Sequence, residues 1–124
     1  MTIRSVGVLG CGLMGSGIAQ VCAAAGYKTV VREVDDILLN KGIGRIKKFL
    51  EDGVVKGKIT AGARDTTLGN LSGTTTFEAL KDCDLIVEAI VESLEQKQDT
   101  YTSLESVVPD RTIFVSNKIG RAHV

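Results

Sequence analysis

Apolar residues in this 124-residue chain form short continuous runs, separated by longer stretches in which they recur every three or four positions. Short runs rich in β-branched residues predict buried strands of a parallel sheet, whereas surface strands alternate apolar and polar residues. The runs with this character are Val6–Leu9, Thr29–Val31, Asp84–Ile90 and Thr112–Ser116.

The stretches between the runs predict helices. From Met14 the apolar residues keep helical spacing as far as Ala25, and Gly26 follows as a natural stop. The pair Asp35-Asp36 is a capping signal for a second helix, which we expect to end at Gly53.

Later segments carry weaker or shorter helix signals. Residues 77–80 predict a short helix, and the S-x-x-Q capping box at Ser93 opens a helix that we expect to run to about Val108, before Pro109. Between residues 54 and 72 the prediction stays open, because Thr60 can cap a short helix that the glycines at 62 and 69 would weaken.

Strand and helix signals alternate through the chain, and its length suits one domain. This alternation predicts an α/β fold: a doubly wound parallel sheet with right-handed connections and helices on both faces.

Composition narrows the class of protein. Lysine plus arginine balances aspartate plus glutamate at 15 each, and the basic residues are scattered, which disfavours a nucleic-acid partner. No run of apolar residues is long enough to span a membrane, and we see no secretory signal. The three cysteines, Cys11, Cys22 and Cys83, form no C-x-x-C pair. We therefore expect reduced thiols and a cytoplasmic location.

The stretch VGVLGCGLMGSGIAQ places Gly10, Gly12 and Gly15 between the first predicted strand and helix. A helix start exposes unpaired N–H groups and partial positive charge, and glycine lets an anion approach them closely. In the G-x-G-x-x-G fingerprint these glycines make the turn, admit a pyrophosphate and let helix pack on strand. A chance match in a chain with 14 glycines is the alternative.

Glu33 strengthens the nucleotide-binding interpretation. It stands at the end of the next predicted strand, where a carboxylate accepts both ribose hydroxyls of adenosine and repels a 2′-phosphate. The sequence therefore favours NAD over NADP. Arg32 should point to the other face of that strand as a surface residue, and we read Cys11 as a small turn residue and not a reactive thiol.

Three stretches together resemble the NAD-binding half of the 3-hydroxyacyl-CoA dehydrogenases: VGVLGCGLMGSGIAQVCAAAGY, LSGTTTFEALKDCDLIVEAIVESLEQKQ and IFVSN. The likeness covers residues 3–117. The G-L-M-G turn is shared with other β-hydroxyacid dehydrogenases, whereas DCDLIVEAIVE with its following lysine is more specific. The resemblance implies a Rossmann-type domain, NAD as cofactor, and hydride transfer with the C3 hydroxyl of an acyl-CoA in fatty acid metabolism.

The same resemblance implies site residues beyond the glycine turn. Leu13 and Met14 fall within the turn motif. By motif match Glu92, Lys97 and Asn117 contact the cofactor, although a dipole-favoured acid and a solvated lysine are the plain alternatives at the first two positions. Lys56 is the nearest match to a basic residue that the family uses for the CoA moiety.

The chain departs from the family after Asn117. The family continues SNTSSL, but here Ile119 takes the position of the serine that touches substrate and nicotinamide. The helical domain and the histidine base of the family are not present in this sequence, and we do not assign that base to His123, which stands one residue from the end. We therefore expect an amino-terminal fragment without catalytic residues, whose full-length enzyme is a homodimer.

Residues 118–124 form an unusual tail. IGRAHV is also the translation of a common sequencing-library adapter, so we expect residues 1–117 to form the NAD-binding domain and the tail to be non-native. Two other interpretations stay open: a fragment of a dehydrogenase for small β-hydroxyacids, against which Glu33 counts, and a non-catalytic NAD-sensing module.

Overall fold

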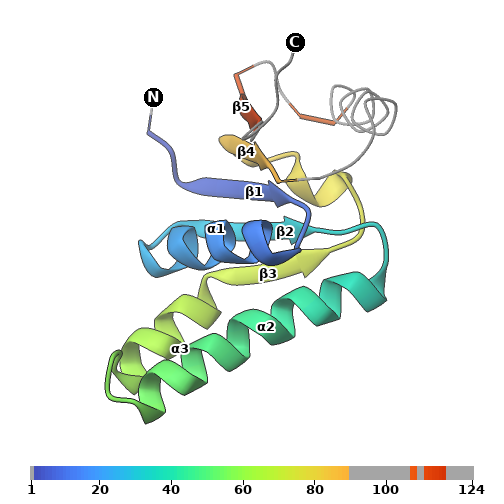
Figure 1. The fold of residues 1–124 in the computed structure, drawn as a ribbon. Coiled ribbons are helices and arrows are strands. Elements are labelled where there is room, and N and C mark those ends of the chain that lie inside the picture. Colours follow the sequence, from blue (N-terminus) through green and yellow to red (C-terminus); the bar gives the residue numbers. More distant parts are fainter. Residues whose placement is uncertain (1, 90–106, 109–110, 117–124) are drawn as a thin grey trace, which may run out of the picture.

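The computed structural model describes residues 2–89, 107–108 and 111–116. Its centre is a five-stranded sheet in which every strand pairs in parallel with its neighbour, in the order β3-β2-β1-β4-β5 (Figure 1). The strands are β1 (Ser5–Leu9), β2 (Lys28–Arg32), β3 (Leu71–Thr74), β4 (Leu85–Glu88) and β5 (Ile113–Ser116). The parallel α/β sheet predicted from the sequence is confirmed.

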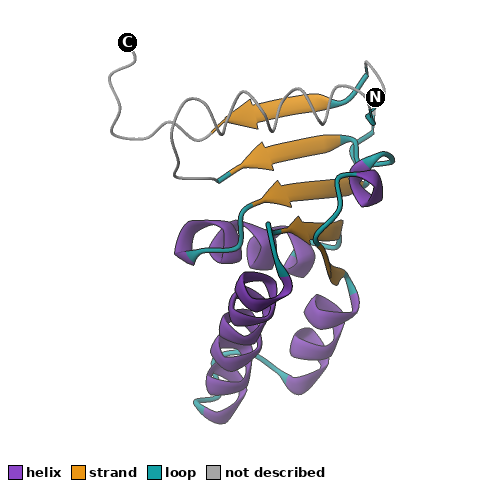
Figure 2. Ribbon diagram, turned by 90° about the vertical axis from the view of Figure 1, so that its right-hand side faces the viewer, coloured by secondary structure: helices purple, strands orange, loops and turns teal. Residues whose placement is uncertain are grey.

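Helices connect the strands and cover the sheet. They are α1 (Leu13–Ala24), α2 (Asp36–Val55), α3 (Ala61–Gly69) and the 3₁₀ helix η1 (Glu78–Leu80). The three α-helices pack together on one face, and η1 lies across the sheet from α1 (Figure 2). In the part of the chain that the structure describes, every helix is too short or too polar to span a lipid bilayer.

Alternation along β1 divides the core between the two faces. Val6 and Val8 join a cluster with Val31 of β2 and the inner residues of the α-helices. Leu9 points the other way, into a second cluster with Leu80 of η1, Ile86 of β4 and Val108. Burial on both faces explains why the strands read as continuous apolar runs.

The region between α2 and β3 corrects one prediction and settles another. Helix α2 does not end at Gly53 but continues to Val55, and the turn that ends it uses Gly57, whose φ is +73°. The side chain of Ile59 packs against Gly53, where an added Cβ would meet its Cγ1 at 3.1 Å. Thr60 does cap α3, because its hydroxyl accepts the Ala63 N–H at 3.0 Å.

Strand β3 was not predicted. Its sequence LSGT has no apolar run, and it becomes a strand because Leu71 to Thr74 pair in register with β2. The helix expected from Ser93 lies outside the described residues up to position 106. Its predicted end at about Val108 is wrong, because Val107 lies in a turn and Val108 in a bend.

Parallel pairing brings the carboxyl ends of the strands to one edge. Leu9 is in register with Arg32 of β2 and with Glu88 of β4, so the carboxyl ends of these three strands lie side by side. Ligands of open α/β sheets bind at this edge.

Candidate dinucleotide-binding site

The turn between β1 and α1 forms the centre of the site. Gly10 has a φ of +98°, the left-handed region that favours glycine, and its N–H donates to the Arg32 carbonyl at 2.9 Å. Gly15 lies in the first turn of α1, where an added Cβ would overlap the Gly10 carbonyl oxygen. The protein's own packing thus accounts for both glycines.

Gly12 has a different environment. It is the N-cap residue of α1, and an added Cβ would have no atom of the described residues within 4 Å. The first turn of α1 contains no acidic residue, so its partial positive charge is not offset by a carboxylate of that turn. The missing side chain therefore leaves an open approach to the amides of a helix start, the environment that phosphate groups bind.

Glu33 stands beside this turn, as the sequence predicts. One carboxylate oxygen accepts the Cys11 N–H at 2.8 Å, and the other accepts the Val34 N–H at 2.9 Å. The carboxylate is thus held between the end of β2 and the glycine turn, next to the α1 start. A sugar hydroxyl can approach the same carboxylate because each oxygen has further acceptor capacity.

The Cys11 side chain packs inward and is 2% exposed. Burial raises the pKa of the Cys11 thiol, and the nearby Glu33 carboxylate raises it further, although the Ser16 hydrogen bond and Arg45 act in the opposite direction. The thiolate is therefore disfavoured, in agreement with reading Cys11 as a small turn residue. All three cysteines are free thiols.

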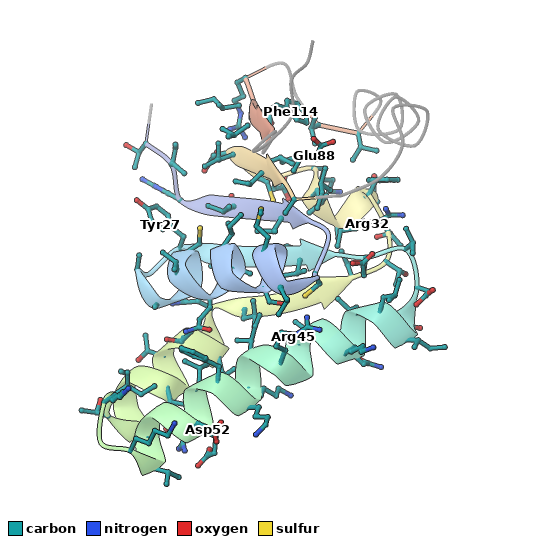
Figure 3. All side chains as sticks on the ribbon, in the orientation of Figure 1. Tyr27, Arg32, Arg45, Asp52, Glu88 and Phe114 are labelled. Atoms are coloured by element: carbon teal, nitrogen blue, oxygen red, sulfur yellow. The ribbon has the colours of Figure 1, made fainter. Side chains whose placement is uncertain are left out.

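Arg32 is more tightly held than the surface residue we expected. Its side chain is half-buried, its guanidinium carbon lies 3.9 Å from the centroid of the Phe77 ring, and its Nε donates to the Thr75 carbonyl at 3.2 Å (Figure 3). It lies on the η1 face of the sheet with Val30, as alternation along β2 requires.

The other predicted site residues divide by position. Leu13 and Met14 are exposed on the first turn of α1, with 79% and 43% of their surface accessible. Lys56 is the C-cap of α2, about three helical turns beyond Arg45, which contacts the Cys11 carbonyl, so Lys56 lies away from the glycine turn. Glu92, Lys97 and Asn117 lie outside the described residues.

Sequence reasoning missed two residues behind the turn and one at the end of β4. Arg45 of α2 and Ser16 of α1 both contact the Cys11 carbonyl. Glu88 ends β4 with 2% of its surface exposed, hidden in the sequence by the apolar run around it. Arg45 is one of several basic residues along α2, and its local sequence gives no sign that it contacts the Cys11 carbonyl.

The arrangement suits an organic anion better than a metal ion. Within the described part of the chain, no group of three or more histidine, cysteine or acidic side chains could hold a metal. An open glycine turn at a helix start, with a carboxylate at the neighbouring strand end, matches the diphosphate and ribose of a dinucleotide. The fold and this site together place the chain among the dinucleotide-binding Rossmann domains.

The family follows from comparison with known proteins. A family model described as "3-hydroxyacyl-CoA dehydrogenase, NAD binding domain" matches residues 5–119, and the chain belongs to this family. The cofactor of the family domain is NAD. The match supports the resemblance to a 3-hydroxyacyl-CoA dehydrogenase domain over the two alternatives, a dehydrogenase for small β-hydroxyacids and an NAD-sensing module.

Individual relatives agree with the family. A 3-hydroxybutyryl-CoA dehydrogenase of Mycobacterium tuberculosis is 44% identical over 87% of this chain and 38% of its own length. The glyoxysomal fatty acid beta-oxidation multifunctional protein MFP-a of Brassica napus is 36% identical over 93% of this chain and 16% of its own length. The crystal structure of M. tuberculosis FadB2 superposes with a TM-score of 0.90 at 42% identity, covering 94% of this chain and 41% of that one. The chain thus spans about two fifths or less of these proteins.

Proposed function

We propose that this chain is the NAD-binding part of an NAD-dependent 3-hydroxyacyl-CoA dehydrogenase of fatty acid metabolism. NAD, when bound, supplies the hydride chemistry by which the C3 hydroxyl of an acyl-CoA is oxidised reversibly to a ketone. The work of this chain is to hold the cofactor in a fixed position at the edge of the sheet. The open glycine turn beside the Glu33 carboxylate is the observation that carries the proposal.

Each residue of the turn has a separate proposed task. Gly12 and the α1 start receive the diphosphate, while Gly10 and Gly15 hold the turn against the sheet. Leu13 and Met14 contact the cofactor from the exposed first turn of α1.

Glu33 is proposed to bind the adenosine ribose and to select NAD over NADP. A 2′-phosphate would lie against its carboxylate and be repelled. Arg32 does not offset this repulsion, because Phe77 and the Thr75 carbonyl engage its guanidinium on the other face of the sheet.

Four further residues complete the proposed site through the family motif. Glu92, Lys97 and Asn117 contact the cofactor, and Lys56 contacts the CoA moiety of the substrate. We assign no catalytic residue to this chain, because Ile119 has no hydroxyl at the position of the family's serine.

The remaining expectations concern the whole protein. We propose that the full-length enzyme is a homodimer, that residues 1–117 form the domain, and that residues 118–124 are non-native. A cytoplasmic location remains a prediction, since the relatives include proteins named as glyoxysomal and peroxisomal. Sequencing the gene through and beyond the codon for Asn117 tests whether residues 118–124 are native: a genomic sequence that encodes them would contradict the proposal.

Titration with NADH tests the cofactor proposal. We expect a saturable change in NADH fluorescence with the wild-type chain and much weaker binding of NADPH. Glu33→Gln should weaken NADH binding about tenfold, since a hydrogen bond to a charged acceptor contributes about 1.5–3 kcal/mol. Because it also removes the repulsive charge, it should narrow the preference for NADH over NADPH.

Glu51→Gln is the matched control, because Glu51 is exposed near the far end of α2 and pairs with Arg64. It should bind NADH like the wild type. A folded wild-type chain that gives no saturable change with NADH, or equal loss of affinity in both variants, contradicts the proposal.

A further inference from the structure

A polar contact from α2 supports the glycine turn from behind. The Nη1 of Arg45 donates to the Cys11 carbonyl at 3.2 Å and to the Ser16 Oγ at 3.4 Å. The Ser16 hydroxyl in turn donates to the same carbonyl at 3.1 Å. Arg45 extends from α2 towards the sheet and lies nearer the turn than Asp52 of the same helix (Figure 3). Two donors from two helices therefore hold one carbonyl of the turn.

Holding this carbonyl fixes the direction of the next amide. The peptide that joins Cys11 to Gly12 is planar and trans, so its N–H points opposite to its carbonyl. Because Arg45 and Ser16 hold the Cys11 carbonyl on the inner side, the Gly12 N–H faces away from them. Gly12 itself is exposed, and no described atom lies within 4 Å of the place where its Cβ would be.

The preceding peptide is fixed from the other direction. The Cys11 N–H donates to the Glu33 carboxylate at 2.8 Å, so both peptides that flank Cys11 have charged partners. The fit between α2 and the turn is also close, because an added Cβ at Gly42 would overlap the Cys11 side chain and carbonyl. The turn is thus held by β2, α1 and α2 together.

We propose that Arg45, with Ser16, is a positioning residue that aims the Gly12 amide at the cofactor diphosphate. This inference rests on the proposed NAD site and adds a contributor from outside the glycine motif. Its physical basis is pre-organisation: a donor already held in its binding direction loses less conformational freedom when the anion arrives.

The test compares two ligands that differ in the diphosphate. Arg45→Met in the 124-residue chain should weaken ADP-ribose binding about tenfold, because a charged donor to the turn is lost. Adenosine, which carries no phosphate and depends on Glu33, should bind within about twofold of wild type. A general structural defect would weaken both ligands equally. Ser16→Ala should give a smaller loss in the same direction, and it tests the proposal if Arg45→Met fails to fold by circular dichroism.

Lys41→Met is the charge-matched control, since Lys41 is exposed on α2 and its loss changes the net charge equally. It should leave ADP-ribose binding within about twofold of wild type. Wild-type affinity for ADP-ribose in folded Arg45→Met and Ser16→Ala, or parallel losses for ADP-ribose and adenosine, would overturn the proposal.

Hydrogen exchange gives a readout that needs no ligand. The Cys11 amide, which donates to Glu33, should exchange faster in Arg45→Met than in the wild type, by about tenfold, while amides in the middle of β1 stay unchanged. If the wild type binds no NADH, the NAD site is refuted; unchanged exchange at the Cys11 amide refutes the role of Arg45 independently.

Discussion

The glycines of the turn differ in what a side chain at each position would meet. At Gly15 the reason is internal, because an added Cβ would overlap the Gly10 carbonyl. At Gly12 no described atom lies within 4 Å of the place where a Cβ would be, so packing among the described residues does not require a glycine there. Substitution at Gly15 should therefore affect mainly the stability of the fold, and substitution at Gly12 mainly the binding of the cofactor.

This difference gives a paired prediction. Gly15→Ala should lower the free energy of unfolding by about 1–3 kcal/mol, because overpacking forces the helix off the strand end. Gly12→Ala should lower it by less than about 1 kcal/mol, the scale of an N-cap exchange, but should weaken NADH binding at least tenfold by blocking the diphosphate. Urea unfolding and NADH titration of each variant check the pair. Strong NADH binding by Gly12→Ala would place the diphosphate elsewhere.

The fingerprint could be predicted from the sequence at this scale, but the residues behind it could not. Gly10 and Glu33 can be identified from their spacing, since both follow predicted strands. Arg45 stands 34 positions from Cys11, and nothing local to it distinguishes it from the other basic residues of its helix.

Among the elements, α2 connects the site to the outer part of the domain. Its N-cap Asp35 accepts the Leu38 N–H at 2.8 Å. Glu33, two residues before this cap, contacts the glycine turn through the Cys11 N–H. Gly42, one turn further on, lets the helix approach Cys11. The start of α2 therefore affects both folding and the shape of the site.

Replacing the cap tests this connection. Asp35→Ala should lower the free energy of unfolding by about 1 kcal/mol, because the Leu38 amide loses its side-chain acceptor. Asp36→Ala removes a neighbouring first-turn acid that is not the cap, so its effect should be at most a few tenths of a kcal/mol. Chemical denaturation monitored by circular dichroism compares them. Equal losses would show that the charge near the helix start, and not the cap, is what matters.

Edges of elements were the least predictable feature. The glycine at position 53 looked like a helix stop, yet the helix passes it because the side chain of Ile59 folds back onto it. Strand β3 lacks any apolar run and forms because the edge of β2 offers it partners. The pairing of β3 joins segments far apart in the sequence, and the contact of Ile59 with Gly53 forms only after the chain turns back at the end of α2.

At the scale of the whole molecule, one carboxylate connects the amino-terminal ends of β1, β4 and β5. Asp84, just before β4, accepts the N–H groups of Arg4 and Ser5 at 2.9 and 3.3 Å and pairs with Arg111 at 2.7 Å. These interactions, the Arg4 N–H foremost and then Arg111, lower the pKa of Asp84 from 3.8 to about 2. The Asp84 carboxylate thus stabilises the edge of the sheet opposite the proposed cofactor site.

This shift predicts an acid-dependent stability. A carboxyl group whose pKa is lower in the folded state stabilises the fold fully above its unfolded value, and loses that contribution as pH falls from about 4 to about 2. Asp84→Asn should therefore lower the melting temperature at pH 7 and flatten its decline over this window. Thermal melts between pH 7 and pH 2 measure both effects.

Asp52→Asn is the control for that experiment, because its pair with Lys48 lies on the exposed surface of α2. Surface pairs contribute little, so this variant should follow the wild-type pH curve. A curve for Asp84→Asn that also matches the wild type would show that the Asp84 charge does not fasten this edge.

Local patterns in the sequence were enough to predict the order of the principal strands and helices, the glycine turn and the acid at the end of β2. These features follow from local rules, since burial on both faces requires apolar runs and a tight turn at a helix start requires glycine. The pairing of β3 and the contact of Arg45 with the turn became visible only in the folded chain, because each joins groups distant in sequence that packing in three dimensions brings together. The end of α2 also needed the structure, because the contact of Ile59 with Gly53 depends on the turn between them.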